Sequence, residues 1–331
     1  MMKNKKRIWL NHWFSAAYFI IELLREEFFV IGSNQNENCV YQKVCDAWFV
    51  EPEYEHDGQY VDFCLDFVRE NNIDIFIPKR GMEAIAKRIS EFAAMGASVM
   101  AESYQKIALL ADKAATYNAL RGSNIVPPFS VVNDLSGFEE AYAKLKTKDN
   151  RICVKFSSDE GALSFRVIDD SVAGYGGLFR GRGSKITYSE AIKTLGSLER
   201  FADMLVMPYL SGVEISADCL ATDSGDIIIP RYKSGRIEEV KYDSCVTASC
   251  SKITKKFGLE YPCNIQFKYD GDKYYLLEVN TRMSGGIHMS CMASGVNIPV
   301  VAVNKLLGVR AAWQVDDTAK LVTYVEKPIL L

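Results

Sequence analysis

Residues 274–282 read Tyr-Tyr-Leu-Leu-Glu-Val-Asn-Thr-Arg, and this stretch determines how the whole chain is interpreted. Side chains alternate between the two faces of a β-strand, so Glu278 and Asn280 share one face. Arg282 follows with the same parity. A carboxylate inside an apolar strand is costly to bury unless it is paired or holds a metal ion. Hard oxygen donors two residues apart suit Mg²⁺ beside phosphates. The alternative is a strand end that turns polar as it meets solvent.

The preceding strand ends in a turn and supplies a third candidate ligand, Gln266. A two-residue loop, Asp270-Gly271, would pair Gln266 with Tyr275 and turn it away from Glu278. A three-residue loop over 269–271, with its glycine in the left-handed region, places the two side chains on one face. We expect the three-residue loop.

Together, Asn264-Ile265-Gln266 and the run Leu-Glu-Val-Asn-Thr-Arg-Met-Ser-Gly-Gly over 277–286 resemble the metal-binding end of ATP-grasp enzymes. The resemblance is strongest to the carbamoyl-phosphate synthase large subunit and related carboxylate–amine ligases. It implies that ATP and Mg²⁺ are the cofactors, with Mn²⁺ as an alternative metal. The metal ligands it implies are Gln266, Glu278 and Asn280, with Asn280 also beside ATP. Arg282 would contact the transferred phosphoryl group as a catalytic residue.

The resemblance also implies two lysines that bind the phosphates of ATP. Lys113 follows Asp112 on a helix, and Lys155 ends the buried strand Ile-Cys-Val-Lys. The implied role of Lys155 is catalytic as well. Each lysine taken alone would be interpreted as a solvated surface group, but their order and spacing favour the functional interpretation.

Two loops come after the second lysine. The loop 157–164, where the family has small residues over the phosphates, holds one glycine and two acids, so it departs from a glycine-rich phosphate loop. The glycine-rich segment 173–185 is either a surface loop or a lid that brings Arg180 or Arg182 to the substrate.

Residues 205–214 resemble the adenine-binding hinge of the family. The resemblance implies backbone contacts to adenine, and it assigns the ribose hydroxyls to Glu214. The first hinge position, commonly acidic in the family, is a methionine here. The hinge residues are Met207, Pro208, Tyr209 and Leu210.

Arg231, Lys233 and Arg236 form a cationic turn before the metal-binding strands. The turn is either a solvated hairpin tip or a binding element. In the second case Arg231 would bind the γ-phosphate or a substrate carboxylate bidentately, as a catalytic residue.

The first hundred residues alternate between strands and helices, which predicts a parallel sheet with helices on its faces. The first strand-to-helix turn, Asn-His-Trp-Phe-Ser at 11–15, lacks a G-x-G-x-x-G fingerprint, and Trp13 and Phe14 would block a pyrophosphate. We therefore interpret this part as a scaffold, in which His12 could face a substrate. The expected strands are 7–10, 28–33, 74–78 and 98–100, and the expected helices are 16–27, 61–71 and 82–95.

The expected fold class is α/β plus α+β. Residues 1–102 would form a Rossmann-like domain of the kind that precedes an ATP-grasp domain. Residues 103–331 would form the two-lobed ATP-grasp fold, with a small lid lobe at about 125–207 and a large lobe at about 208–331. The elements expected there are helices at 103–121, 188–200 and 298–307 and strands at 151–156, 163–168, 204–209, 213–220, 226–230, 262–269 and 273–280.

The composition excludes several classes of function. Among 331 residues, 48% are hydrophobic, and the net charge is −3, which argues against a nucleic-acid partner. Nine cysteines without a C-x-x-C pair favour a reducing cytoplasm. The three histidines lack metal-like spacing, which argues against a zinc site. No apolar run is long enough to predict a membrane span. An apolar scaffold helix could form the contact of a homodimer.

The resemblance implies an ATP-dependent carboxylate–amine (or ammonia) ligase that acts through an acylphosphate on small-molecule substrates. One alternative is a carbamoyl-phosphate-synthase-like subunit that uses bicarbonate. The other is a regulator that binds ATP without catalysis.

Overall fold

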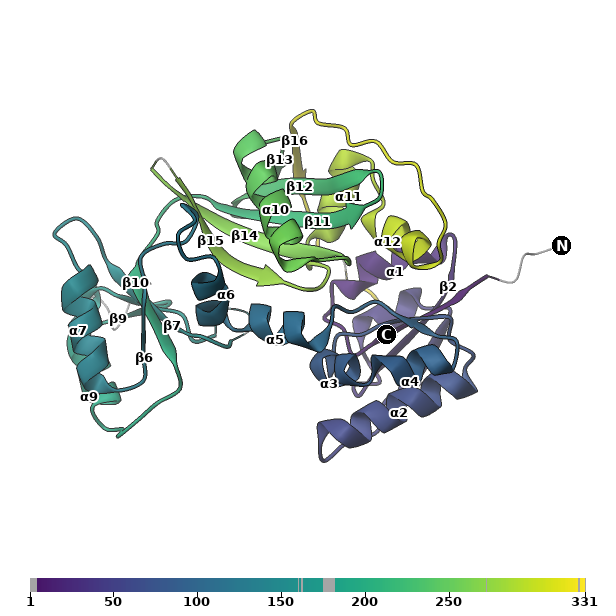
Figure 1. Cartoon of the computed structure of the whole chain (residues 1–331), viewed down its shortest axis with the longest axis horizontal. Coiled ribbons are helices and arrows are strands. Elements are labelled where there is room, and N and C mark those ends of the chain that lie inside the picture. Colours follow the sequence, from purple (N-terminus) through teal and green to yellow (C-terminus); the bar gives the residue numbers. More distant parts are fainter. Residues whose placement is uncertain are drawn as a thin grey trace. The chain divides into compact units, whose positions relative to one another are not determined.

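The computed structural model describes residues 5–159, 161, 163–174, 182–271, 273–326 and 328–330 (Figure 1). Contacts divide the chain into two compact units. The first unit comprises Met1–Ala108, Ile215–Gln266 and Val279–Leu331, and the second comprises Leu109–Glu214 and Phe267–Glu278. Two of the boundaries therefore fall inside the strands that carry the candidate metal ligands.

The first unit begins with a parallel sheet of order β3-β2-β1-β4-β5, which confirms the expected parallel sheet. Its central strand is fully buried at Ile8, Trp9 and Leu10, as is typical of a sheet covered on both faces. The sequence pattern did not predict β3 or the short 3₁₀ helix η1 (Val40–Val44) before it. The strands are β1 (Arg7–Asn11), β2 (Phe29–Asn34), β3 (Ala47–Val50), β4 (Ile75–Ile77) and β5 (Ser98–Val99).

Helices α1 (Ala17–Arg25) and α2 (Asp57–Glu70) agree with the expected ones apart from their ends. Two other expected helices are each broken in two. Asp112 breaks the second of these because its side chain caps the following helix, accepting the Ala115 amide at 3.0 Å. The resulting helices are α3 (Met82–Lys87), α4 (Ile89–Ala94), α5 (Tyr104–Ala111) and α6 (Lys113–Ala119).

The second unit contains a five-stranded sheet of order β6-β10-β7-β8-β9. Asp134 caps α7 through the Gly137 amide at 2.8 Å. Side chains of α7 and α9 pack on the sheet with Ile152 and Val206. The elements are β6 (Ser130–Val132), α7 (Leu135–Leu145), β7 (Ile152–Phe156), β8 (Arg166–Ile168), η2 (Asp170–Val172), β9 (Lys185–Ile186), α9 (Tyr188–Leu195) and β10 (Met204–Pro208).

A six-stranded sheet has the order β15-β14-β11-β12-β13-β16, and α10 packs against β12 (Figure 1). The sequence pattern did not predict β13, β16, α10 or α11. The elements are β11 (Glu214–Thr222), β12 (Gly225–Ser234), β13 (Ile237–Val240), α10 (Ser244–Phe257), β14 (Cys263–Asp270), β15 (Lys273–Asn280), α11 (Ile287–Ser294), α12 (Ile298–Leu306) and β16 (Lys320–Thr323).

The expected three-residue loop between β14 and β15 is wrong. Tyr269 and Asp270 belong to β14, and the loop begins at Gly271, whose φ is 70°. Asp272 lies outside the described residues, and β15 starts immediately after it. The Tyr269 ring packs against that of Tyr274 with centroids 5.0 Å apart, a cross-strand pair that favours the longer hairpin.

The alternation of side chains along β15 is interrupted. Leu276 and Val279 are both buried although they lie three positions apart, whereas a regular strand with one buried face buries every second residue. The Tyr117 hydroxyl lies 2.8 Å and 3.0 Å from the consecutive carbonyl oxygens of Leu276 and Leu277. Both features are typical of a β-bulge, which adds one residue to one strand.

The alternation of side chains along β15 decides whether Gln266 can face Glu278. The loop that the structure forms would turn Gln266 away from Glu278 if β15 alternated regularly. A β-bulge with one extra residue in β15 would reverse this parity. Gln266 belongs to the first unit and Glu278 to the second, so their sharing of a metal ion is part of the proposed function only.

Within the described part of the chain, no single helix is long and apolar enough to cross a membrane. Helices α11 and α12 together have the length and composition, but they are bent by 98° at their break. Most of their apolar side chains belong to the core of the first unit.

Candidate functional site

The N-terminus of α6 places Lys113 at the end of strand β7. The Lys113 amide donates to the Ser157 carbonyl at 2.9 Å, and the Ser157 hydroxyl contacts both Asp112 and the Ala114 amide. The Lys113 ammonium donates to the Asp159 carbonyl at 2.6 Å. These contacts hold a buried lysine beside the loop expected to cover phosphates.

Lys155 is the second cation, and strand β7 carries it toward the same place. Its ammonium donates to the Leu277 carbonyl at 3.2 Å and to the Tyr117 hydroxyl at 3.3 Å. Tyr117 was not among the residues expected from the sequence. Its signal is its position four residues after Lys113, which places both on one face of α6.

Lys113 pairs with a carboxylate of β15, Glu278, whose charge also acts on Lys155. The Lys113 nitrogen lies 3.7 Å from Glu278 Oε2, and the two side chains are 9% and 27% exposed. Burial and, to a smaller extent, the nearby Lys113 lower the pKa of Lys155 to about 8, while Glu278 opposes the shift. Two ammonium groups beside this carboxylate make a local environment suited to phosphate oxygens.

The loop after Lys155 is shaped by one of its acidic residues. Asp159 accepts the Ser164 amide at 2.7 Å and the Ser164 hydroxyl at 2.5 Å. Glu160 and Ala162 lie outside the described residues. Asp159 therefore builds the turn, which accounts for part of the departure from a glycine-rich pattern.

Of the two expected lid arginines, Arg180 lies outside the described residues. Arg182 forms an ion pair with Glu190, the residue that completes the capping box of α9 with Thr187. This pairing gives Arg182 a structural partner.

The predicted adenine hinge lies at the end of β10. Met207 is buried in the sheet, and its neighbour Pro208 has no amide proton to offer. The Tyr209 amide donates to the Arg151 carbonyl at 2.7 Å, and the Arg151 guanidinium lies 4.7 Å from the tyrosine ring. The Tyr209 amide is thus engaged, so the hinge carbonyls and the Leu210 amide are the groups to test for adenine contacts.

Gly212 joins the hinge to the ribose candidate Glu214, which begins β11. A Cβ at Gly212 would overlap the backbone carbonyl of Tyr269, so only glycine fits there. The Tyr269 amide donates to the Val213 carbonyl at 2.9 Å. This close approach fixes the path of the backbone from the hinge to Glu214.

In the first unit, Arg282 follows β15 and packs against the N-terminal sheet. Its guanidinium carbon lies 5.4 Å from the centre of the Phe14 ring. It also lines a small pocket of about 10 Å³ together with Trp13 and Met82. The sequence suggested Phe14 only as an obstacle to nucleotide binding, and the structure makes it a support for Arg282.

Gln266 and Asn264 lie two residues apart on β14. The Gln266 amide donates to Asn264 Oδ1 at 3.2 Å, and the Asn264 amide donates to Asp218 at 2.9 Å. Asn264 is buried, so this network orients the side chain of Gln266. Asn280, the last residue of β15, is half-buried.

Arg231 is buried, with 2% of its side chain exposed. It forms ion pairs with Asp218 at 3.2 Å and with Glu238, and it donates to the Ser290 hydroxyl at 2.9 Å. A Cβ at Gly286 would collide with the guanidinium. Arg231 therefore lies in a buried network rather than at a solvated tip, which favours a positioning role over direct substrate binding.

The donor set on β14 and β15 can be compared with the needs of Mg²⁺. Across the described residues, no group of three or more histidine, cysteine or acidic side chains is arranged to hold a metal ion. By chemical type, the predicted ligands Glu278, Asn280 and Gln266 are one carboxylate and two neutral amide oxygen donors. Such a set fits a hard cation that keeps several waters and shares its coordination with phosphates.

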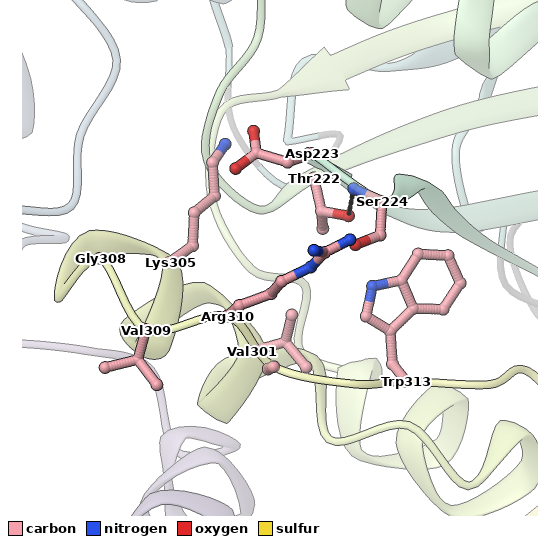
Figure 2. A pocket seen from close by; sticks show the side chains of 10 residues that line it. Thr222, Asp223, Ser224, Val301, Lys305, Gly308, Val309, Arg310 and Trp313 are labelled. Carbon is pink, nitrogen blue, oxygen red and sulfur yellow. Dashed lines mark hydrogen bonds between the residues drawn. The ribbon is translucent and has the colours of Figure 1, made fainter.

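A larger pocket of about 290 Å³ lies elsewhere in the first unit (Figure 2). The side chains of Lys305 and Arg310 point from the C-terminal segment toward the turn at 222–224. Lys305 donates to the carbonyls of Ala221 and Glu260 at 3.0 Å and 2.7 Å, so its charge serves the fold. No residue that the sequence suggested as a site candidate lines this pocket.

Comparisons with known proteins identify similar sequences. Residues 200–328 match the family model described as ATP-grasp in the biosynthetic pathway with Ter operon. The chain is 23% identical over 272 residues to the carbamoyl phosphate synthase large chain of Clostridium acetobutylicum, covering 76% of this chain and 24% of that protein. It is 24% identical over 331 residues to the arginine-specific large chain of Geobacillus stearothermophilus, covering 93% and 29%. The chain thus spans less than a third of the length of these relatives.

Similarity to solved structures identifies the fold of the chain. N5-carboxyaminoimidazole synthetase from Staphylococcus aureus, complexed with ADP, matches with a TM-score of 0.71 at 14% identity, over 98% of this chain and 83% of that one. The biotin carboxylase domain of Hydrogenobacter thermophilus 2-oxoglutarate carboxylase, in complex with MgADP and bicarbonate, gives 0.70 at 16% identity over 95% and 72%. The expected resemblance and fold class are confirmed: the chain has the ATP-grasp fold, and its residues 200–328 match an ATP-grasp family model.

Proposed function

We propose that the chain is an ATP-dependent ligase that activates a carboxylate as an acylphosphate and joins it to an amine or ammonia. The observation that carries the proposal is the convergence of Lys113, Lys155 and Glu278 in the second unit. Two ammonium groups largely withdrawn from water are costly to hold together, and in the described part of the chain Glu278 is the carboxylate that pairs with Lys113. The phosphates of ATP would supply the missing negative charge.

The nucleotide would be held by the hinge and by the two lysines. Adenine would contact the backbone at 207–210, and Glu214 would accept from the ribose hydroxyls. Lys113 and Lys155 would lie along the phosphates. The metal ion would neutralise charge on the phosphates during transfer, and its ligands would be Glu278, Asn280 and Gln266.

The chemistry proceeds in two displacements. A carboxylate oxygen attacks the γ-phosphorus, the bond to the bridging oxygen breaks, and ADP leaves. The amine nitrogen then attacks the acyl carbon, phosphate leaves, and the amine loses a proton to solvent. Here the chain supplies orientation and positive charge, with Arg282 assigned to the transferred phosphoryl group. No side chain has to form a covalent bond.

Bicarbonate is the second candidate for the carboxylate. The observation in its favour is that the carbamoyl phosphate synthase large chains match most of this chain in sequence. The chain spans only 24% and 29% of those proteins, so their substrate comes to this chain as a candidate to be tested beside amino acids and organic acids.

The test is ADP release from purified protein with Mg-ATP and a panel of carboxylates that includes amino acids and bicarbonate. Each carboxylate is supplied with and without ammonia or a second amino acid. Release that depends on one carboxylate and is lost in Glu278→Gln supports the ligase. Tight Mg-ATP binding by calorimetry without release from any mixture would contradict it and favour a non-catalytic regulator.

A further inference from the structure

The N-terminal sheet has a topological switch point between β1 and β4. From β1 the chain moves outward to β2 and β3 on one side, and then returns to place β4 and β5 on the other. In open parallel sheets, ligands bind in the crevice beyond the carboxyl ends of the strands at such a reversal. The residues after β1 and β4 are therefore candidates for ligand binding.

These two loops are tied to each other by Asn11, the last residue of β1. Asn11 Oδ1 accepts the Lys79 amide at 2.7 Å, and its side-chain amide donates to the Arg80 carbonyl at 3.0 Å. Asn11 is fully buried. The positions of His12 after β1 and of Arg80 after β4 are thus fixed relative to one another.

His12 adopts a backbone conformation that is rare for a non-glycine residue, with a φ of 38°. Strain of this kind gathers at functional positions, where the surrounding structure maintains it. The Arg80 guanidinium lies 3.3 Å from His12 Nδ1 and donates to Gln35 Oε1 at 2.6 Å. Because arginine only donates, Nδ1 must accept, and the neutral imidazole then carries its proton on Nε2 as a second donor.

A buried carboxylate supports this arrangement. Glu51 Oε1 accepts the Ser33 hydroxyl at 2.7 Å, and Oε2 lies 3.3 Å from the Tyr60 hydroxyl and 3.6 Å from His12 Nδ1. Burial raises the pKa of Glu51, while its hydrogen bond from Ser33 and the charge of Arg80 oppose the shift. The Glu51 side chain is 0% exposed, whereas that of His12 is 33% exposed. Glu51 therefore positions its neighbours, and His12 is the group that reaches the surface.

Arg80 is the cation at the carboxyl ends of β1 and β4. Its guanidinium carbon lies 5.3 Å and 5.2 Å from the ring centres of Tyr54 and Tyr60, which hold it in place. Two of its hydrogen-bond partners, His12 and Gln35, carry no negative charge, and the acidic group that its charge acts on, Glu51, is fully buried behind them. An oriented guanidinium between neutral side chains is suited to an external carboxylate, which matches its planar donors.

The shape of the turn limits the ligand to a small molecule. Trp13 fills the space after His12, because it is buried and its indole nitrogen donates to the Ile77 carbonyl at 2.9 Å. A dinucleotide is thereby excluded. The same loops, through Trp13, Pro78 and Met82, line the small pocket that Arg282 completes.

We propose that His12, Arg80 and Gln35 form a recognition site for a carboxylate that is not itself phosphorylated, carried by one of the small-molecule substrates. The substrate is accordingly a dicarboxylic acid or an α-amino acid. This inference rests on the proposed function for its role in catalysis, because Arg282 next to the site is assigned to the transferred phosphoryl group. As a binding site it stands on the N-terminal sheet alone.

The test measures binding and turnover separately. Calorimetry with succinate, L-aspartate and L-glutamate, and with succinamide as a neutral analogue, is carried out on wild type, Arg80→Met and Arg80→Lys. Arg88→Met is the matched control, because Arg88 belongs to the same sheet domain but pairs with Glu91 and Asp62 at the surface. Thermal unfolding of each variant verifies that it is folded.

Wild type should bind at least one of the three carboxylates and not succinamide. Loss of a charge-assisted hydrogen-bonding partner should weaken binding by about tenfold to a hundredfold in Arg80→Met. Arg80→Lys should recover part of the affinity, and Arg88→Met should bind the carboxylate as wild type does. The affinity of every variant for Mg-ATP should be unchanged. In turnover assays KM for the carboxylate should rise more than kcat falls.

Two results would overturn the site: no binding of any of the three carboxylates to wild type, or equal binding to wild type and Arg80→Met. Inorganic phosphate is titrated in the same way, and its binding in place of the carboxylates would also overturn the site. If carboxylate binding depends on Arg80 but no mixture releases ADP, then the proposed ligase activity fails and the binding site remains.

Discussion

The ammonium nitrogen of Lys113 lies 3.7 Å from Glu278 Oε2, although the two residues are 165 positions apart in the chain. Helix α6 supplies the lysine and strand β15 supplies the carboxylate. The pair joins a phosphate-binding candidate to a metal-binding candidate, so the proposed function can be tested on either partner.

Glu278→Gln keeps the shape of the side chain and removes its charge. We expect Mg-ATP to bind about tenfold to a hundredfold more weakly, because the change removes a charged metal ligand and a partner of Lys113. Calorimetry at several Mg²⁺ concentrations measures this. The control is Glu239→Gln, which alters a partly exposed ion pair with Lys241. Equal weakening in both variants would contradict a specific role for Glu278.

Lys155→Met should raise stability and weaken ATP binding. Burial lowers the folded pKa of Lys155 to about 8, below its ordinary value of 10.5, so folding penalises its charged form. Replacement by an apolar side chain removes a penalty on the order of 1–3 kcal/mol at neutral pH, less the two hydrogen bonds lost. Urea unfolding measures the gain, and Lys193→Met on the exposed surface of α9 is the control.

The lowered pKa of Lys155 also sets the sign of the pH dependence of stability. Between about pH 8 and pH 10 the unfolded state keeps the Lys155 proton and the folded state releases it, so wild-type stability should rise with pH in this window. Lys155→Met should lack that contribution. A wild type and a variant with parallel stability profiles across the window would show that Lys155 is not desolvated as described.

Gly212→Ala should disturb the hinge. The added Cβ would overlap the carbonyl of Tyr269, so the backbone between the hinge and Glu214 must shift. We expect a loss of about 1–3 kcal/mol in the free energy of unfolding and weaker binding of both ATP and ADP. The neighbouring substitution Ser211→Ala adds no atoms and should leave both quantities unchanged. Normal nucleotide affinity in Gly212→Ala would mean that this stretch is not the hinge.

Arg231→Met should act mainly on stability. It leaves Asp218 buried with its ion pair broken, which costs about 3–5 kcal/mol. Arg236→Met, at the exposed tip of the same hairpin, should cost less than about 0.5 kcal/mol. The measurements are urea unfolding and ADP release below the unfolding transition. Full stability with lost turnover in Arg231→Met would restore the catalytic role that the sequence suggested.

Many elements of the fold can be predicted from local patterns. The strands and helices of the first hundred residues are periodic, and Asp134 marks a helix start by its chemistry. The elements that were not predicted have weaker signals. Helix α10 carries Ser, Thr, Cys and Lys residues with only a few buried positions, and β13 is short and polar. These form because neighbouring parts of the chain cover them, and no local window of sequence contains those neighbours.

In the candidate site too, some residues could be predicted from the sequence and others only from the structure. Lys113, Lys155 and Glu278 could be selected from motif order, but Tyr117 could not be tied to them until α6 and β15 were placed. The sequence could not separate Arg231 from its neighbours in the cationic turn: Arg231 lies buried in β12, whereas Arg236 lies at the exposed tip of the hairpin. The switch-point residues Asn11, Arg80 and Glu51 lie at the ends of three different strands, and only the order of the sheet brings them together.

The most direct test of carboxylate activation follows the oxygen atoms. The carboxylate identified by ADP release is labelled with heavy oxygen and incubated with the protein, Mg-ATP and the amine, and the released phosphate is analysed by mass spectrometry. An acylphosphate route transfers one labelled oxygen from the carboxylate to each phosphate, and Glu278→Gln should abolish the transfer. Phosphate that carries no label during substrate-dependent turnover would contradict activation of the carboxylate through an acylphosphate.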